Sequence, residues 1–307
     1  VGELRVLWKK SVGRRSKDVQ VPVLRGVELV EVVDIGGYRV GVMMQSVFHQ
    51  ATVVVRGDED TTREEVDQWL VHISSVERVV VATVMTVAGV DGGVPRFMVT
   101  FDMSGLSRDE FLTLVAKRLS VLCYSPDEVE IMWHVQSVDD VAGYASSVWA
   151  PSSKVVFPPF ADELVEGPRS IVCDGVARVV FEVNAHDAAG LAALEEIRRL
   201  VVSASLGVGE SMYVVEVVRP TDSLYRVQYP EADRFRRSGI IVLSAESDVG
   251  LEGFAAEMIA RISVRSRLRL SRLYGRQYLG VLLAAGIPVY GWQTSRVTSL
   301  VSKMVKK

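Results

Sequence analysis

Cysteine and histidine are scarce in this chain of 307 residues, and their scarcity excludes several kinds of site. The two cysteines, Cys123 and Cys173, cannot form a disulfide scaffold or, by themselves, a four-ligand zinc site. The four histidines are scattered and do not complete a metal site. We therefore expect no metal and no other cofactor. So few cysteines also fit a reducing compartment, and we expect an intracellular protein, cytoplasmic or associated with the cytoskeleton.

Long apolar segments are also lacking. The longest apolar run, Leu279 to Trp292, is too short and too rich in glycine to span a bilayer, so we expect no membrane span. The first residues do not resemble a signal peptide. Because the chain begins with Val1 and not with methionine, we expect a piece of a longer protein or a processed one.

The motifs of common active sites are absent as well. The sequence contains no HExxH, CxxC or GxSxG. The glycine-rich stretch GVDGG, residues 89–93, leads from one expected strand to another and cannot present a helix N-terminus to a phosphate. His72 lies in an expected helix, either as a polar-face residue or as a general base, and we favour the first role. The sequence therefore predicts a protein that is not an enzyme.

The chain is rich in apolar residues and has a low net charge. Hydrophobic residues make up 49% of it, valine above all, and the formal net charge is −3. Such a chain buries substantial cores, and its length suits about two domains. It has no overall positive field that would concentrate nucleic acid around it.

Hydrophobic periodicity predicts the element order βαββαβ twice. In the first occurrence, strands are expected at 51–56, 79–87, 93–103 and 129–135. The capping boxes Thr61-Thr62-Arg63-Glu64 and Ser107-Arg108-Asp109-Glu110 predict where its two helices begin. In the second occurrence, strands are expected at 178–183, 213–218, 239–243 and 268–274, with helices over 191–201 and 251–262. This order is typical of the ferredoxin-like fold.

The expected fold class is therefore α+β, with two tandem ferredoxin-like units. We expect an N-terminal β-rich element at 1–50, docked on the first unit at 51–136. The second unit would occupy 177–276, followed by a C-terminal helical segment at 277–307, with its helix after Ser295. The connector, 137–176, contains four aromatic residues and should be ordered, because folding tends to bury rings of that size.

The first unit resembles the RNA-recognition motif over residues 51–136. That resemblance implies stacking aromatics on the third strand, which here reads GVPRFMVTFDM. Strand alternation instead turns its aromatic residues, with Val99, toward the helices and leaves Arg96, Met98 and Thr100 outside. Arg96 and Met98 therefore stand at the two stacking positions. Without rings there, RNA binding of the usual kind is disfavoured.

Arginines near the end of the second unit support RNA binding instead. Arg265, Arg267 and Arg269 alternate along an expected strand and would share one face, as a track for phosphates. The alternative, which we favour, is an edge strand that charge protects from aggregation.

Tandem ferredoxin-like units with a helical histidine also resemble the CRISPR-repeat endoribonucleases. That family holds RNA with a glycine-rich loop near the C-terminus. The corresponding stretch here is Ser263-Val264-Arg265-Ser266, which contains no glycine. An RNA-processing endoribonuclease is thus a third and weaker expectation.

We expect a non-enzymatic protein–protein interaction or scaffold module, a globular part of a larger assembly protein. The partners would be other proteins, with a degenerate RNA-binding protein as the alternative. Mixed aliphatic and polar outer sheet faces support the first choice. The candidate binding residues are Arg96, Met98, Met132, Arg265, Arg267 and Arg269.

Overall fold

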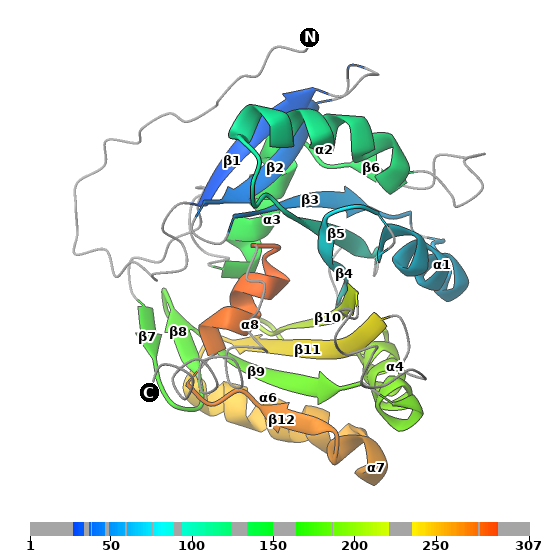
Figure 1. Ribbon diagram of the computed structural model, residues 1–307. Coiled ribbons are helices and arrows are strands. Elements are labelled where there is room, and N and C mark those ends of the chain that lie inside the picture. Colours follow the sequence, from blue (N-terminus) through cyan, green and yellow to red (C-terminus); the bar gives the residue numbers. More distant parts are fainter. Residues whose placement is uncertain are drawn as a thin grey trace, which may run out of the picture.

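The computed structural model describes residues 27–33, 37, 39–46, 49–58, 60–74, 76–88, 94–123, 134–149, 164–185, 187–220, 235–275 and 277–287. These residues form an α+β fold around a single 12-stranded sheet, and all of the strand pairs in it are antiparallel. Helices cover both faces of the sheet (Figure 1).

The first half of the sheet contains β1 to β6. Its elements are β1 (Val27–Val33), β2 (Arg39–Gln45), β3 (Gln50–Arg56), α1 (Arg63–Ser74), β4 (Val79–Val87), β5 (Arg96–Asp102), α2 (Arg108–Cys123) and β6 (His134–Val135). The strands pair in the order β1-β2-β3-β5-β4, and β6 pairs with β3 beyond the end of β2. The expected strands at 51–56 and 79–87 thus match β3 and β4.

The second half follows after α3 (Val138–Trp149). Its elements are β7 (Leu164–Glu166), β8 (Ile171–Cys173), β9 (Val176–Asn184), α4 (Ala188–Val202), β10 (Ser211–Pro220), β11 (Phe235–Ala245), α6 (Asp248–Arg261), α7 (Val264–Arg267), β12 (Leu270–Arg272) and α8 (Gln277–Ala284). The strands pair in the order β10-β11-β9-β8-β7, and β12 also pairs with β9. The residues after Ser295, where a helix was expected, lie outside the described part of the chain.

Strands β4 and β10 join the two halves into one sheet. They pair from Tyr213 opposite Val87 to Val218 opposite Ala82. The sequence analysis had expected two units linked by an ordered connector. Part of that connector is regular structure, because it forms α3, β7 and β8.

Local capping explains where the helices begin. The Ser107–Glu110 capping box is present: the Ser107 amide donates to Glu110 Oε2 at 2.9 Å. The box of α1 lies one residue later than predicted, because the Thr62 amide donates to Glu65 Oε2 at 2.6 Å. Asp187 caps α4 by accepting from the Gly190 amide at 2.8 Å.

One face of the sheet, here called the four-helix face, is covered by α1, α2, α4 and α6. Its core is divided in two. The first part packs Phe97, Val99 and Phe101 of β5 against α1 and α2, and the second packs β9, β10 and β11 against α4 and α6. The Trp69 indole links α1 to α2 by donating to the Leu122 carbonyl at 3.0 Å. The strand phase predicted for β5 is therefore confirmed.

The opposite face, here called the two-helix face, is covered by α3 and α8, which lie next to each other (Figure 1). It has one core that crosses both halves, including Met98, Ile240 and Val242. In α8, a Cβ added to Gly280 would lie 2.4 Å from the Val180 side chain, so only glycine allows this close approach. The expectation that Met98 lies on an uncovered sheet face is wrong, because α3 and α8 cover that face and leave Met98 2% exposed.

Candidate binding cleft

The residues predicted to bind do not come together. Arg96 and Met98 lie on β5, but Met98 is part of the buried core and only Arg96 reaches a cleft. Met132 lies outside the described residues. The predicted arginines lie in α7 and in the turn before β12, and β4, β10, β11 and β9 separate β12 from β5 in the sheet.

The arginine track predicted on one strand is wrong. Arg265 and Arg267 lie in α7, where the Ser263 side chain accepts from the Ser266 amide and starts a helical turn. Alternate residues of a helix do not share a face. Arg267 Nε donates to the Ile262 carbonyl at 2.7 Å, at the end of α6, and Arg269 pairs with Asp187 at 2.9 Å. These two arginines stabilise neighbouring segments of the chain itself.

A cleft with a volume of about 750 Å³ lies on the two-helix face. This size is within the usual range for small-ligand sites. Both halves of the sheet contribute to it. The lining residues are Arg56, Val87, Arg96, Gln136, Asp139, Asp140, Gly143, Tyr144, Val176, Gly209, Glu210, Ser211, Tyr213, Ser244 and Glu246.

Two tyrosines form the aromatic part of this cleft. Tyr144 of α3 is nearly buried, and its hydroxyl donates to the Ala284 carbonyl of α8. Burial raises the pKa of Tyr144 well above its ordinary value, against the opposing effect of the Arg96 charge, so the hydroxyl stays protonated. The Arg96 guanidinium lies 4.8 Å from the centre of the Tyr144 ring, a cation–π contact. Tyr213 of β10 is 9% exposed.

A buried hydroxyl without a partner also lines the cleft. Ser244 of β11 is 3% exposed, and its Oγ makes no hydrogen bond within the described residues. Buried polar atoms are almost always paired, so a lone hydroxyl in a cleft wall indicates a group that a ligand can satisfy. Ser244 lies opposite Ser211 on β10 and opposite Arg178 on β9.

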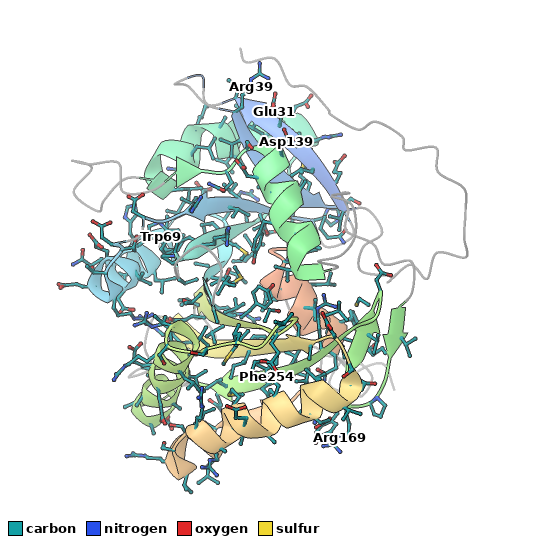
Figure 2. All side chains as sticks on the ribbon, turned by 180° about the vertical axis from the view of Figure 1, so that it is seen from behind. Glu31, Arg39, Trp69, Asp139, Arg169 and Phe254 are labelled. Atoms are coloured by element: carbon teal, nitrogen blue, oxygen red, sulfur yellow. The ribbon has the colours of Figure 1, made fainter. Side chains whose placement is uncertain are left out.

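Charged groups surround the aromatic part. Arg56 and Arg96 lie directly opposite each other on β3 and β5. Asp139 and Asp140 belong to the first turn of α3, and Figure 2 labels Asp139 at that end of the helix. The Asp140 carboxylate already accepts from the Ser137 hydroxyl at 2.7 Å.

Two further carboxylates, those of Glu210 and Glu246, stand at the β10 and β11 end of the cleft. The Glu210 carboxylate accepts from the Gly207 amide at 2.8 Å, whereas Glu246 makes no hydrogen bond or ion pair within the described residues. Counted over the lining, four carboxylates stand against two guanidinium groups. The cleft therefore carries a net negative charge, with its positive groups at one end.

Arg178 lies beside Ser244 but does not line the cleft. It is 1% exposed, and it makes no ion pair with the described residues. Its Nη1 donates to the Val176 carbonyl at 3.3 Å, while its Nε lacks a partner in the described structure. Burial lowers the pKa of Arg178, and the nearby Cys173 and Tyr213 oppose that shift. A guanidinium in this setting is costly to desolvate.

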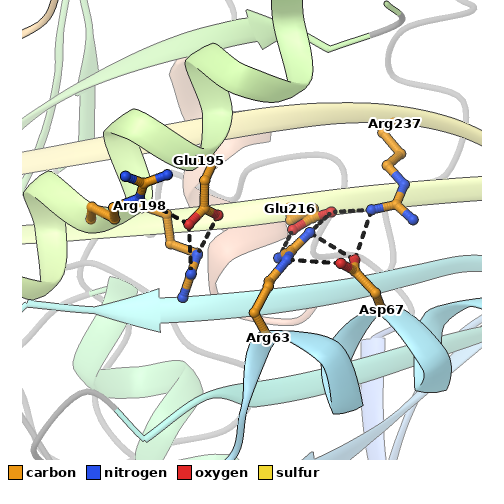
Figure 3. Close-up of polar contacts among 7 residues, drawn as sticks. Arg63, Asp67, Glu195, Arg198, Glu216 and Arg237 are labelled. Carbon is orange, nitrogen blue, oxygen red and sulfur yellow. Dashed lines mark hydrogen bonds and ion pairs between the residues drawn. The ribbon is translucent and has the colours of Figure 1, made fainter. Parts of the chain in front are cut away.

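A second cleft, of about 470 Å³, lies on the four-helix face. Figure 3 shows the ion network at its rim, which ties α1 to β10 and β11. Arg63 binds both carboxylate oxygens of Glu216, at 2.6 and 3.0 Å. Arg237 binds Asp67 at 2.9 Å and Glu216 at 3.2 Å.

A second set of contacts in this cleft lies on α4, where Glu195 holds Arg198 and Arg199. The guanidinium groups of this cleft are therefore already paired. The ion network of Arg63, Asp67, Glu216 and Arg237 connects α1 to β10 and β11. We assign no ligand to this second cleft.

Neither an activated thiol nor a metal centre is found among the side chains that the structure describes. Burial raises the pKa of the Cys173 thiol to about 11, so it is protonated at neutral pH and is a poor nucleophile. Within the described residues, no cluster of histidine, cysteine and carboxylate side chains is arranged to hold a metal ion. Nor is any helix in that part long and apolar enough to cross a membrane.

The sequence analysis missed most of the cleft. It expected the connector, which includes Tyr144, to be ordered because it contains four aromatic residues, and the Tyr144 ring is buried. The local sequence around Arg56, Ser244 and Glu246 does not indicate a shared site, because these residues come from segments up to 190 positions apart (246 − 56). Only the pairing order β3-β5-β4-β10-β11 brings them to one face.

No protein-family model matches this chain, and neither does any curated protein. Two solved structures are distantly similar. One is BBE-like #28 from Arabidopsis thaliana, at 11% identity and a TM-score of 0.37 over 79% of this chain and 52% of that one. The other is 6-hydroxy-D-nicotine oxidase from Arthrobacter nicotinovorans, at 10% identity and a TM-score of 0.34 over 87% and 56%. The chain thus spans about half the length of either, and both TM-scores are too low to support an argument.

Proposed function

We propose that this chain is a non-enzymatic interaction module that binds a segment of another protein in the cleft of the two-helix face. The observation that carries the proposal is the cleft itself. It is open, its floor is aromatic and its rim is charged, and aromatic surfaces with polar rims are typical of protein interfaces.

The length of the cleft suits an extended segment better than a small molecule. It crosses the sheet from Arg56 on β3 to Ser244 on β11, which is four strand spacings in the pairing order. At about 4.8 Å per spacing this is roughly 19 Å. An extended chain covers that distance with about six residues.

RNA is the alternative partner, and the structural support for it is weaker than the sequence suggested. The alternating arginines that favoured it do not share a strand, and Arg267 and Arg269 have partners within the chain. The cleft lining is negatively charged overall, which would repel a phosphate backbone.

We propose further that each half of the sheet derives from a ferredoxin-like unit. The strand order β6-β3-β5-β4 in the first half has the same sequence pattern as β12-β9-β11-β10 in the second, and both combine with two helices on the four-helix face. An intracellular setting is proposed with it, on the low cysteine content.

Blocking the cleft tests the proposed function. Heptapeptides displayed on phage are selected against the protein, and the affinity of enriched peptides is measured by fluorescence anisotropy. Gly143 of α3 lines the cleft, and a Cβ there would meet no atom within 4 Å, so Gly143→Trp should fold and fill the cleft. We expect it to weaken peptide binding by about tenfold or more.

Gly253 supplies the matched control. It also lies in a helix, α6, and a Cβ there would likewise meet no atom within 4 Å. Gly253→Trp should leave peptide binding unchanged. Failure to enrich any peptide, or equal binding by both variants, would refute the proposal. Salt-sensitive, submicromolar binding of mixed single-stranded RNA that Gly143→Trp abolishes would favour the RNA alternative instead.

A further inference from the structure

We infer that the cleft recognises the charge order of the bound segment, with an acidic side chain held at the β3 end and a basic one at the β11 end. The inference rests on the proposed function and adds the chemistry of the partner to it.

Arg56 defines the β3 end. It is exposed, it makes no hydrogen bond or ion pair within the described residues, and it stands opposite Arg96 in the strand register. Like charges directly opposite on a sheet destabilise each other. The Tyr144 ring holds Arg96 by a cation–π contact, which leaves Arg56 as the cation that a ligand carboxylate can pair with.

The carboxylates on α3 form no ion pair with Arg56 in the described structure. Asp140 accepts hydrogen bonds from both the hydroxyl and the amide of Ser137 in the capping box of α3. Asp139 is exposed, and it forms no ion pair with Arg56 or Arg96 in the described structure. A carboxylate from a partner therefore finds an available guanidinium at this end of the cleft.

Glu246 defines the β11 end. It follows β11 immediately, is exposed, and has no partner within the described residues. Glu210 adds a second carboxylate at this end, and the unpaired Ser244 hydroxyl lies in the wall. A lysine or arginine side chain would meet the two carboxylates, and the backbone of the segment would supply a partner for the hydroxyl.

Buried Arg178 weakens the negative potential of this end without cancelling it. Its guanidinium is fully enclosed, and two carboxylates, those of Glu210 and Glu246, line this end of the cleft against its single charge. The two ends thus differ in charge: the β3 end has Arg56 and Arg96 beside the two carboxylates of α3, whereas the charged lining residues at the β11 end are Glu210 and Glu246. Electrostatic complementarity of this kind affects which partner binds more than it affects how tightly that partner binds.

Charge exchange between protein and peptide tests the inference. The probes are four capped heptapeptides that share the central residues of a selected peptide and differ only at the two terminal positions. The N-terminal and C-terminal residues are Glu and Lys, Lys and Glu, Glu and Glu, or Lys and Lys. Of the two mixed-charge peptides, one has the charge order that matches the cleft. The wild type should bind this peptide about three to ten times more tightly than either single-sign peptide.

Reversing the protein charges should then reverse the preference. Glu246→Lys should favour the peptide with two glutamates, and Arg56→Glu the peptide with two lysines. The double variant should again prefer a mixed-charge peptide. Both residues are exposed and unpaired in the described structure, so the variants should fold. Glu257→Lys, on α6 and outside this cleft, is the control and should leave the preference as in the wild type.

The outcomes separate the inference from the proposed function. If peptides bind and Gly143→Trp abolishes binding, but the charge reversals leave the preference unchanged, the inference is wrong and the interaction module stands. If peptides bind regardless of Gly143→Trp, both fail. A preference of the wild type for a single-sign peptide would also overturn the inference.

Discussion

The two faces of the sheet are built differently. On the four-helix face the core is divided, with one part under α1 and α2, another under α4 and α6, and the Arg63–Glu216 ion network between them. On the two-helix face one continuous core runs under α3 and α8 and includes residues of both halves. Polar contacts thus join the halves on one face and apolar packing joins them on the other.

This difference bears on how the two halves of the sheet are held together. Burial of apolar surface is the dominant stabilising term in folding, and on the two-helix face a single core shares it between the halves. The pairing of β4 with β10 adds backbone hydrogen bonds to this shared core. We therefore expect the two halves to unfold together, and five substitutions test the contrast between the faces.

The largest effect is expected from a charge in either core. Met98→Asp and Val99→Asp each bury an unpaired carboxylate, one on each face, because both side chains are nearly inaccessible. Each should lower the free energy of unfolding by at least about 4 kcal/mol, measured by denaturant titration followed by circular dichroism. Met98→Leu is the control and should cost less than about 1.5 kcal/mol. A well-folded Met98→Asp would mean that α3 and α8 do not cover this face.

A smaller loss is expected from the packing of α8. In Gly280→Ala, the new methyl group would lie 2.4 Å from Val180 Cγ1, on a buried strand. We expect a loss of about 1–3 kcal/mol from overpacking. Gly253→Ala, where a Cβ meets no atom within 4 Å, should instead raise stability by about 0.5–1 kcal/mol through helix propensity. Equal effects of the two substitutions, in the same denaturation assay, would contradict close packing of α8.

The ion network on the four-helix face should contribute less than the shared core. Glu216→Gln removes the carboxylate that both Arg63 and Arg237 bind. The two arginine side chains remain 30% and 21% exposed, so solvent screens part of the loss, and we expect about 1–2 kcal/mol. Glu64→Gln, at an exposed position of α1, should change stability by less than about 0.5 kcal/mol. A loss from Glu216→Gln as large as that from Met98→Asp would show that the ion network, and not the apolar core, is the main connection.

The smallest effect on stability is expected at Arg178. Because this buried guanidinium has no ion pair in the described structure, Arg178→Met removes a desolvation cost while nearly keeping the volume. Stability should change by less than about 1 kcal/mol, or rise. The same change should strengthen binding of a peptide with two lysines by about two- to threefold, because it removes a positive charge beside Ser244. A large loss of stability would indicate that Arg178 has a partner outside the described residues.

Much of the local structure was predictable from the sequence. The alternation in β4 and β5 and the capping box Ser107–Glu110 are local signals, and the structure follows them. The last strand predicted for the second unit, 268–274, contains β12, but Arg265 and Arg267 lie before it, in a helical turn that Ser263 caps. The alternating arginines matched the two-residue period of a strand by coincidence. That pattern does not show that the Ser263 side chain can cap a helical turn at the same place.

The candidate site was the least predictable part. Arg96 was identified from its outward position on β5, but its stacking on Tyr144 depends on where α3 docks. Met98 was assigned to the same surface and lies in the core instead. An outward strand position has the same sequence pattern whether water or a helix covers it, because methionine and valine occur in both settings.

The sequence by itself determined the α+β class, the repeated order of strands and helices, and which side of β5 faces α1 and α2. These properties depend on side-chain periodicity within about ten residues. Only the tertiary structure decided that β4 pairs with β10, that α3 and α8 cover the second face, and that Arg56 and Glu246 share a cleft. Those features depend on contacts between residues more than a hundred positions apart, as with Ala82 and Val218, and the free energy of such contacts comes from burial that no local pattern records.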